Sequence, residues 1–558
     1  MRDPVKDILE GRAAKWLGQY TLEQVPEWIC KNTRLDGKPF SFVGHEYQLR
    51  ILRSPAPVVV VKKCSQVGIS ELMARRLLAL TNLIDNFTAI FTLPTVDFAR
   101  KFTKTRIDPI ISNSEYLKSR IHTSLDNSEV KQFGDNNFLY IRGTFGANQA
   151  ISVPADMVAH DEVDFSNPDA LSSFQSRLTH STYRWKMLVS TPTVAKVGVS
   201  GHFDASRRFY NFVKCHHCGH FFLPDFSKHI ILPGFDGHLL ELTRDTIHKY
   251  AVDDAYLACP QCGNEPDLSP EHRDWVCENS EERHDAEGFQ VQPFDAPTVV
   301  SIPYLLRASV SYKRKVDFIN FNLGKEAEDA DSGITEADLA MMFGPRVNSY
   351  HTHVMGVDMG QECHIVISGV CGYDRMDIVH TEIVHYSKVA DRVGQLIHLY
   401  RILAVVVDSQ PYVETVYRLQ QAHQQVFGSV YVTSKNLDTF TLRARDDTEE
   451  ESRGLLEVRQ VNVNRNKAFD GLLEYIRAGN LHICNTEHEE KFKTHLQDMK
   501  RVRDIRAYEE SYLWQKSAQG DDHFFHALLY CWVAFKLRGL DITDVSSLPV
   551  GVFSFRVK

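Results

Sequence analysis

The sequence predicts an α/β protein with two α/β parts, and three features of the chain support this prediction. The first is the apolar, β-branched run Val58–Val61, which leads through a glycine-containing loop into the helical stretch Glu71–Asn82. The second is the alternation of short β-rich runs with helical stretches from residue 58 to about 200, which is typical of a parallel sheet with crossover helices. The third is a second α/β pattern that begins at His353 and continues to about residue 540.

Size and composition indicate a multidomain globular protein. With 558 residues the chain is too long for one hydrophobic core, so we expect two or three domains. Its 43% hydrophobic and 24% charged residues are ordinary for such proteins. No apolar run approaches the ~20 residues that span a bilayer. A signal peptide begins with positively charged residues, whereas acidic residues lie near this N-terminus. We therefore expect neither export nor membrane insertion.

The net charge and the spacing of the cysteines limit the kinds of partner and the cellular compartment that we expect. The net charge is −9, so the chain as a whole lacks the excess of basic residues that is typical of nucleic-acid-binding proteins. Contacts with DNA must then come from local basic patches, of which Lys500–Arg506 is a candidate. The alternative is that this run is only a solvated helix face. Four of the 11 cysteines form two Cys-x-x-Cys pairs and the others are scattered. This pattern suits a reducing compartment and one metal site better than a set of disulfides.

Composition and patterning divide the chain into six segments. Residues 205–285 are rich in His, Cys, Asp and Pro, and a polar linker is expected before the second α/β part, which would end in a helix at His523–Lys536. We also expect a strand at Thr298–Ile302. The six segments are an N-terminal helical segment (1–45), a first α/β core (46–204), a cysteine-containing insertion (205–285), the rest of the first α/β part with a linker (286–345), a second α/β domain (350–540) and a C-terminal tail (541–558).

The loop after the first strand has the chemistry of a phosphate-binding loop. In such loops, backbone N–H groups and a helix N-terminus face the anion, a lysine neutralises charge and a hydroxyl holds Mg²⁺. Ile69 occupies the usual position of the lysine, so Lys63, or its neighbour Lys62, must supply the charge from the front of the loop. Taken alone, Gly68-Ile69-Ser70 is more typical of an ordinary strand-to-helix turn than of a phosphate loop. The residues expected to bind ATP here are Lys63, Gln66, Val67, Gly68, Ile69 and Ser70.

Two later strands end in residues that complete such a site. The run Met157–Glu162 ends in two acids, of which Asp161 would bind Mg²⁺ and Glu162 would activate the attacking water. A further strand ends in Ser190-Thr191-Pro192-Thr193, whose hydroxyls could sense the γ-phosphate. Taken singly, the acid pair could be two solvated acids at a strand end, and the Ser-Thr-Pro-Thr segment could be an ordinary turn. Their common position at strand ends, however, matches nucleotide sites at the carboxyl edge of an α/β sheet.

These motifs together resemble the large subunit of tailed-phage terminases, the DNA-packaging motor, over about residues 40–535. In the lambda-type branch of that family the loop lysine is moved to the front, as it is here. The resemblance implies that Tyr47 stacks on adenine and that Gln48 hydrogen-bonds to it. It also implies that Ser190, Thr191 and Thr193 couple hydrolysis to movement. Arg100 or Arg142 could serve as an arginine finger, or form surface salt bridges.

The paired cysteines predict a structural zinc site. Cys215-x-x-Cys218 and Cys259-x-x-Cys262 are each followed by glycine, a pattern that can present four thiolates tetrahedrally to Zn²⁺. About 40 residues separate the pairs, more than the ~15–20 of a compact ribbon, so we expect an insertion between the two knuckles. His216, His217 and Cys277 are alternative ligands.

Acids in the second α/β part predict a nuclease. Asp358 and Asp408 each end an apolar strand, and Asp521 and Asp522 precede the apolar helix from His523. Two-metal phosphodiester cleavage needs carboxylates that converge on ions about 4 Å apart. This order of acids is that of ribonuclease-H-like nucleases, which is the fold of the terminase nuclease domain. The resemblance implies that Asp358, Asp408 and Asp522 bind Mg²⁺ or Mn²⁺, with Asp521 in support and Glu382 as a rival ligand.

The leading interpretation is therefore a viral DNA-packaging enzyme with a P-loop ATPase, a zinc-ribbon-like insertion and a ribonuclease-H-like nuclease. The resemblance implies duplex DNA, a portal and prohead, a small terminase subunit and a homo-oligomeric ring as partners, in the host cytoplasm and outside the mature virion. One alternative is an ATP-driven helicase or repair translocase with a degenerate nuclease fold. Another is a zinc-organised DNA-binding scaffold with a vestigial nucleotide loop.

Overall fold

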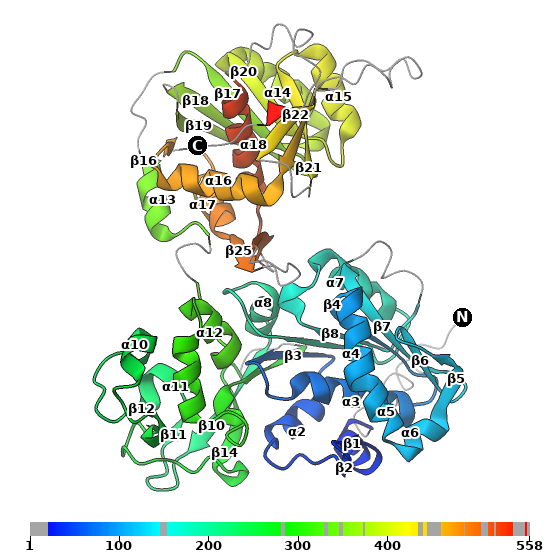
Figure 1. Cartoon of the computed structure of the whole chain (residues 1–558). Coiled ribbons are helices and arrows are strands. Elements are labelled where there is room, and N and C mark those ends of the chain that lie inside the picture. The colour runs from blue at the N-terminus through cyan, green and yellow to red at the C-terminus, as the bar shows by residue number, and fades with distance from the viewer. Residues whose placement is uncertain are drawn as a thin grey trace. The chain divides into compact units, whose positions relative to one another are not determined.

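The computed structural model (Figure 1) divides the chain into two compact units, Met1–Asp329 and Ala330–Lys558. Within these units the structure describes residues 21–145, 153–280, 285–328, 333–344, 350–371, 374–432, 439–443, 459–484, 486–503, 512–517, 520–538 and 553–554. Much of the predicted N-terminal segment and of the C-terminal tail therefore lies outside the described residues. Within the described part, no helix combines the length and the apolar character needed to cross a bilayer.

The first unit is built on one large sheet with a parallel centre, and this confirms the predicted α/β fold. Seven neighbouring strands run parallel, in the order β10 (Arg207–Lys214), β15 (Ala286–Val291), β3 (Val58–Lys63), β9 (Trp185–Ser190), β8 (Met157–Asp161), β4 (Thr88–Thr95) and β7 (Asn137–Phe145). Antiparallel strands extend both edges, namely β11 (Phe221–Phe222) and β14 (Arg273–Cys277) beside β10, and β6 (Val130–Phe133) and β5 (Ile121–Asp126) beyond β7.

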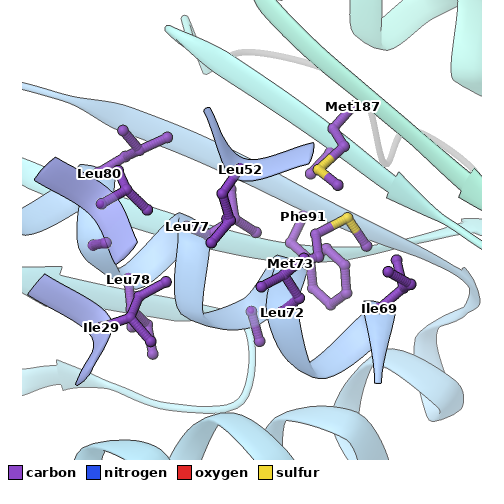
Figure 2. Packing of buried hydrophobic residues seen from close by; sticks show 14 of the residues in the cluster. Ile29, Leu52, Ile69, Leu72, Met73, Leu77, Leu78, Leu80, Phe91 and Met187 are labelled. Carbon is purple, nitrogen blue, oxygen red and sulfur yellow. The ribbon is translucent and has the colours of Figure 1, made fainter. Parts of the chain in front are cut away.

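Helices cover both faces of this sheet, because alternate residues of each buried strand point to opposite sides. Val59 and Val61 of β3 belong to the same apolar cluster as α3 (Ile69–Leu83), whereas Val60 packs with α8 (Gly198–Asp204) on the other face. Figure 2 shows the apolar side chains of α3 against Phe91 and Met187 of the sheet. The helix is therefore held by burial on the strand side, and this fixes its N-terminus at the end of β3.

The other elements of the first unit connect or flank this sheet. Residues 21–32 are helical. The remaining helices are α2 (Tyr47–Leu52), α4 (Val96–Phe102), α5 (Asp108–Ser112), α6 (Glu115–Arg120), α7 (Pro168–Gln175), α9 (Phe226–His229), α10 (Arg244–Ile247), α11 (Ile302–Ser311) and α12 (Lys315–Leu323). Two small ribbons pair β1 (Arg34–Leu35) with β2 (Lys38–Pro39), and β12 (Ile230–Ile231) with β13 (Tyr256–Leu257).

The strand expected at Thr298–Ile302 is wrong. Residues 297–300 form a turn, and α11 begins at Ile302. Ser301 caps this helix through a hydrogen bond to the backbone N–H of Tyr304, and Pro303 lies in the first turn, where its missing N–H costs nothing. The capping serine and the proline therefore favour a helix start here more strongly than the β-branched residues favour a strand.

The second unit contains a mixed sheet whose order agrees with the predicted ribonuclease-H-like fold. Three antiparallel strands are continued by three parallel ones, in the order β19 (Arg375–His385), β18 (Glu362–Cys371), β17 (His353–Asp358), β20 (Ile402–Asp408), β21 (Val426–Val432) and β23 (Gln460–Asn464). The sheet is extended by β24 (Leu481–Cys484) and β16 (Phe343–Gly344) at one edge, and by β22 (Phe440–Arg443) and β27 (Phe553–Ser554) at the other.

Helices also cover both faces of the second sheet. The apolar helix α18 (His523–Leu537) packs with Val354, Val366 and Val406 on one face, while Val357 and Val407 point to the other. That other face is covered by α14 (Tyr386–Tyr400) and α15 (Val413–Ala422). The remaining elements are α13 (Glu336–Met342), α16 (Arg465–Arg477), α17 (Glu489–Gln497) and the ribbon of β25 (Met499–Arg503) with β26 (Tyr512–Lys516).

Candidate nucleotide and metal sites

The loop between β3 and α3 has the backbone of an anion-binding turn. Gln66 and Gly68 both adopt left-handed conformations, with φ of 66° and 72°. At Gly68 a Cβ atom would lie 3.0 Å from Nε2 of Gln48, so the loop needs glycine both for its φ and for this close approach. The N–H groups at the start of α3 follow directly, and they can face a phosphate.

Lys63, rather than Lys62, faces the acids of this site. Its Nζ lies 3.2 Å from Oε1 of Glu162 and 3.5 Å from Oγ1 of Thr191. Burial alone would lower the pKa of Lys63, but the carboxylates of Glu162 and Asp161 outweigh it and raise the pKa above its usual value. Lys62 instead pairs with Glu326 at 2.8 Å on the opposite face of the strand.

The two acids after β8 lie beside the loop, as the strand order requires. Asp161 is buried and accepts a hydrogen bond from the hydroxyl of Ser70. Burial, with the negative charge of Glu162, raises the pKa of Asp161 to about 6. Glu162 has a φ of 55°, a left-handed conformation that is uncommon for a non-glycine residue and is one form of backbone strain found at active sites. The structure thus brings Lys63, Ser70, Asp161 and Glu162 together.

Tyr47 and Gln48 contact the loop itself. Both side chains donate hydrogen bonds to the backbone carbonyl of Val67, at 3.2 Å from Nε2 of Gln48, and both are buried. They therefore hold the turn that precedes Gly68, whatever they contribute to a bound base.

Asp164 organises the segment from Ser190 to Thr193, and sequence reasoning missed it. Its buried carboxylate accepts hydrogen bonds from N (3.0 Å) and Oγ1 (2.9 Å) of Thr193 and from N of Val199 (2.7 Å). Its own N–H donates to Oγ of Ser190, at 3.2 Å. Burial raises the pKa of Asp164 to about 7. The position two residues after the acid pair was a signal, but nothing in the sequence marks this carboxylate as buried.

Both candidate finger residues form ion pairs within the first unit. Nη2 of Arg100 lies 3.1 Å from Oε1 of Glu129, and Nη1 of Arg142 lies 3.9 Å from Oε2 of the same residue. Arg142 also donates to the backbone carbonyl of Glu129, at 2.8 Å. In this structure both arginines therefore form the salt bridges that were the alternative to an arginine finger.

The four paired cysteines converge on one point. Their Sγ atoms all lie within 4.8 Å of one another, with Cys215 and Cys262 at 3.7 Å and Cys218 and Cys259 at 3.7 Å. Each pair closes the same turn, because Gly219 and Gly263 adopt φ near 75° and donate back to the first cysteine of the pair. Four converging thiols fit a tetrahedral Zn²⁺.

The alternative zinc ligands lie outside this cluster. Nδ1 of His216 accepts a hydrogen bond from N of Asp267 at 3.0 Å, and Cys277 lies on β14 opposite Phe209. Between the two knuckles lie β11, α9 and the β12–β13 ribbon, so the expected insertion is present.

The acids of the second unit meet at one edge of its sheet. Asp358 ends β17 and Asp408 ends β20, and these are neighbouring parallel strands with Val357 paired to Val407. Burial raises the pKa of Asp408 to about 6, and the negative charge of Asp358 adds to the effect. Asp522 immediately precedes α18. Burial alone would raise its pKa, but its ion pair with His526, at 3.3 Å, holds the pKa well below its usual range.

Asp521 and Glu382 are less central. The carboxylate of Asp521 is more than half exposed and lies 3.9 Å from Nε2 of His495. Glu382 is held by Arg392 at 2.8 Å and by His380 at 3.0 Å. Asp358 and Asp408 therefore end neighbouring strands, and Asp522 precedes the helix that packs on them. Among the described residues, however, the only one of these three acids in a group of ligand atoms within 4.8 Å of one another is Asp358.

The basic run expected to hold DNA is partly a strand. Residues 499–503 form β25, and Nε of Arg501 pairs with Oδ1 of Asp470 at 2.9 Å. The rest of the run, residues 504–506, lies outside the described residues. This part of the run is therefore not the helix face considered from the sequence.

Two histidines beside Asp358 were not predicted as ligands. Nδ1 of His523 lies 2.9 Å from Oδ2 of Asp358, and His364 lies directly across the β17–β18 ladder from the same aspartate. The hydrogen bond with Asp358 raises the pKa of His523, whereas burial lowers the pKa of His364 to about 3. The sequence gives only the short distance between Asp358 and His364 around Gly360 as a signal.

The fold and these sites define a class of protein: a nucleotide-hydrolysing P-loop domain joined to a domain of nuclease fold. Residues 52–280 match the family model for the ATPase domain of the phage terminase large subunit gpA. This region is therefore similar to the ATPase domain of that family, which agrees with the resemblance to large terminase subunits seen in the sequence. DNA packaging driven by ATP hydrolysis is the function that fits this family.

Comparison with solved structures agrees at the level of the fold. The large terminase of bacteriophage HK97 is 11% identical, with a TM-score of 0.50 over 91% of this chain and 98% of that one. A large terminase from a thermophilic bacteriophage (11% identical, 91% and 97% covered) and the terminase nuclease of the thermophilic phage G20c (12% identical, 36% and 98% covered) have TM-scores of only 0.29 and 0.25. No curated protein matches the chain.

Proposed function

We propose that this chain is the catalytic subunit of a DNA-packaging machine, in which the first unit hydrolyses ATP to move duplex DNA into a prohead. The observation that carries the proposal is the convergence of Lys63, Ser70, Asp161 and Glu162 at the carboxyl edge of one parallel sheet. Nucleotides bind at this edge in open α/β sheets.

The roles of the residues at the nucleotide site follow from their positions. Lys63 and the backbone of residues 66–69 hold the phosphates, while Ser70 and Asp161 would hold Mg²⁺, which would supply charge neutralisation at the phosphates. Glu162, on its left-handed turn, orients and deprotonates the attacking water. Tyr47 and Gln48 fix the loop and face the base. Ser190, Thr191 and Thr193 transmit the state of the γ-phosphate through Asp164 and α8.

The second unit supplies an endonuclease that cuts concatemeric DNA. Asp358, Asp408 and Asp522 would hold two Mg²⁺ or Mn²⁺ ions, which would supply activation of the attacking water and charge stabilisation at the leaving oxygen. Asp521 supports this set from the outer side. The buried state of Asp358 and the proximity of Asp408 suit metal binding, because two neighbouring carboxylates need positive charge between them.

The remaining assignments belong to the same proposal. Cys215, Cys218, Cys259 and Cys262 bind a structural Zn²⁺ that closes the insertion of residues 205–285. The six-segment division of the chain is retained, with β10 and β14 framing the zinc segment as part of the ATPase sheet. The working complex contains duplex DNA, a small terminase subunit, a portal and prohead and a ring of copies of this chain. It acts in the host cytoplasm and leaves before the virion matures.

Paired activity assays on the full chain test the proposal. We expect duplex DNA to stimulate ATP hydrolysis by the wild type, and Glu162→Gln to abolish hydrolysis while metal-dependent plasmid cleavage remains. Asp408→Asn should abolish cleavage and leave hydrolysis intact. Asp391→Asn, at an exposed position of α14, is the matched control. A wild type that hydrolyses ATP without cutting would favour a helicase or repair translocase, and one that does neither would favour a DNA-binding scaffold.

A further inference from the structure

Three side chains from separate elements of the second unit converge beside the acid cluster. Asp358, His364 and His523 each offer a ligand atom, and these atoms all lie within 4.8 Å of one another. We propose that these residues bind one divalent transition-metal ion through two imidazole nitrogens and a carboxylate oxygen. The inference deepens the proposed nuclease, because Asp358 would be shared between this ion and the all-oxygen part of the centre.

The fold places the two histidines beside Asp358 by independent routes. In the antiparallel ladder of β17 and β18, Asp358 is paired directly with His364, and such opposed residues have neighbouring Cβ atoms. His523 comes from the first turn of α18, which packs across the same strands. Neither placement depends on an exposed loop.

His364 lacks the hydrogen bonds that a buried imidazole normally has. The residue is only 1% exposed, and among the described residues neither Nδ1 nor Nε2 makes a hydrogen bond of strict geometry, although the backbone of Glu362 lies close to the ring. Most buried polar side-chain atoms in proteins have at least one partner, so the ring lacks at least one partner that a buried imidazole normally has. A metal ion beside Asp358 would supply the missing partner.

The neighbouring rings support this reading. Nδ1 of His523 lies 2.9 Å from Oδ2 of Asp358, and two ligands bound at right angles to one ion at about 2.1 Å would be about 3 Å apart. The rings of His364 and His523 stack, with their centroids 4.9 Å apart. His495 lies nearby, but its Nδ1 already accepts a hydrogen bond from N of Phe524 at 3.1 Å.

The donor set selects the class of metal. Mg²⁺ prefers oxygen ligands and retains its waters, whereas imidazole nitrogen favours first-row transition metals such as Mn²⁺, Co²⁺ and Zn²⁺. Asp408 and Asp522 offer only oxygen atoms and suit a second, harder ion. The centre would thus be mixed, with one nitrogen-bearing position and one all-oxygen position.

Electron paramagnetic resonance of Mn²⁺ bound to the zinc-loaded, nucleotide-free full chain tests the inference directly. We expect spin-echo modulation from imidazole nitrogen in the wild type. The modulation should disappear in the double variant His364→Asn, His523→Asn, and Mn²⁺ binding should weaken at least tenfold, since even partners of metal ligands are worth about 10- to 100-fold. The exposed His398→Asn on α14 is the control and should retain both.

The outcomes separate this inference from the proposed nuclease. His523 is about two-fifths exposed, so its variant can be used alone if the variant at His364 fails to fold. His523→Asn should then reduce the depth of the nitrogen modulation, and an unchanged depth would overturn the site. Wild-type Mn²⁺ without nitrogen modulation, or modulation that survives the double variant, would overturn the site. Cleavage without modulation contradicts only the histidine ligands, whereas modulation without any cleavage contradicts only the nuclease.

Discussion

At the residue scale, two adjacent lysines at the end of β3 have different roles. Lys63 faces Glu162 and Thr191 in the nucleotide site, while Lys62 pairs with Glu326 and lies 4.3 Å from the centroid of the Phe203 ring. Successive side chains of a strand point to opposite faces of the sheet, and this separates the two lysines. The sequence alone did not decide which of them faces the phosphates.

Replacement of each lysine tests this separation. Lys63→Ala should lower kcat for ATP hydrolysis by about 100- to 1,000-fold, the usual effect of losing one donor to transition-state charge. Lys62→Ala should reduce thermal stability and leave kcat within several-fold of the wild type. Steady-state ATPase assays measure both. Equal losses of kcat in two folded variants would contradict the assignment.

Asp164 is the residue through which we expect hydrolysis to reach the coupling segment. Asp164→Asn places an amide NH₂ group near three donors, and unsatisfied buried groups cost about 1–3 kcal/mol. We expect kcat to fall by up to about 100-fold, with the KM for ATP little changed, because Asp164 contacts Thr193 and not the phosphate loop. Asp169→Asn, at an exposed position of α7, is the control. A rise in KM alone would contradict this role.

The same carboxyl gives a pH signature. Its pKa is about 7 in the folded protein against about 4 in the unfolded chain, so the unfolded chain binds fewer protons between these values. The stabilisation from Asp164 is complete below about pH 4 and is lost as the pH rises through about 7. Thermal unfolding should therefore show a larger advantage of wild type over Asp164→Asn at pH 5 than at pH 8.

Individual residues show where sequence reasoning ends. The loop, the acid pairs and the cysteine knuckles were predictable, because each is a short motif whose chemistry needs adjacent residues. Asp164 and His364 were not, because their importance comes from burial and from partners on other strands. Tyr47 and Gln48 were predicted by resemblance, but their contact with the carbonyl of Val67 could only be seen in the fold.

At the scale of elements, the turn after α12 supports the phosphate loop. Gly324 has a φ of 63°, and a Cβ there would lie 2.6 Å from the backbone N of Cys64. The obstacle is backbone, so the loop itself would have to move. Gly37 has a similar φ of 77° with nothing within 4 Å, and it is a matched control.

Gly324→Ala should weaken ATP binding through this contact. We expect an increase in the dissociation constant of at least tenfold, whereas Gly37→Ala should cost only about 1 kcal/mol of stability, from the strained φ, and leave binding unchanged. Titration with a fluorescent ATP analogue measures both constants. Unchanged binding in a folded Gly324→Ala protein would show that α12 does not position the loop.

The cysteine knuckles should act as one structural element. Metal analysis of the purified chain should find about one zinc per chain, and Cys259→Ser should lose it, because metal binding and local folding are coupled. Proteolysis between residues 219 and 258 should then accelerate. Cys277→Ser, outside the cluster, should keep the zinc. Equal zinc content in both variants would contradict the site.

Strands with polar or mixed composition were the hardest elements to predict. The strand β15, Ala286–Val291, lies between β10 and β3 in the parallel part of the first sheet, yet it contains Glu287, Gly288 and Gln290. Glu287 is buried there because Arg50 and Ser54 satisfy its carboxylate at 2.6–3.1 Å. Such partners lie more than 200 residues away and leave no local signal.

At the scale of the whole molecule, both units use the same device. Each places acids at the carboxyl ends of parallel strands, where adjacent strands bring residues distant in sequence within reach of one ligand. The order of strands and acids along the chain, together with the family resemblance, predicted the fold of both units. The outer strands, and the residues that position the side chains of each site, could be identified only from the structure.

Packaging by purified proheads tests the central claim most directly, namely that one chain carries a DNA motor and a separable nuclease. The measured quantity is nuclease-protected DNA after addition of ATP, with either genome-length linear DNA or concatemers as substrate. We predict that Asp408→Asn packages linear DNA at the wild-type level and fails on concatemers, while Glu162→Gln packages neither. Loss of linear-DNA packaging in a folded Asp408→Asn protein that still hydrolyses ATP would contradict the account.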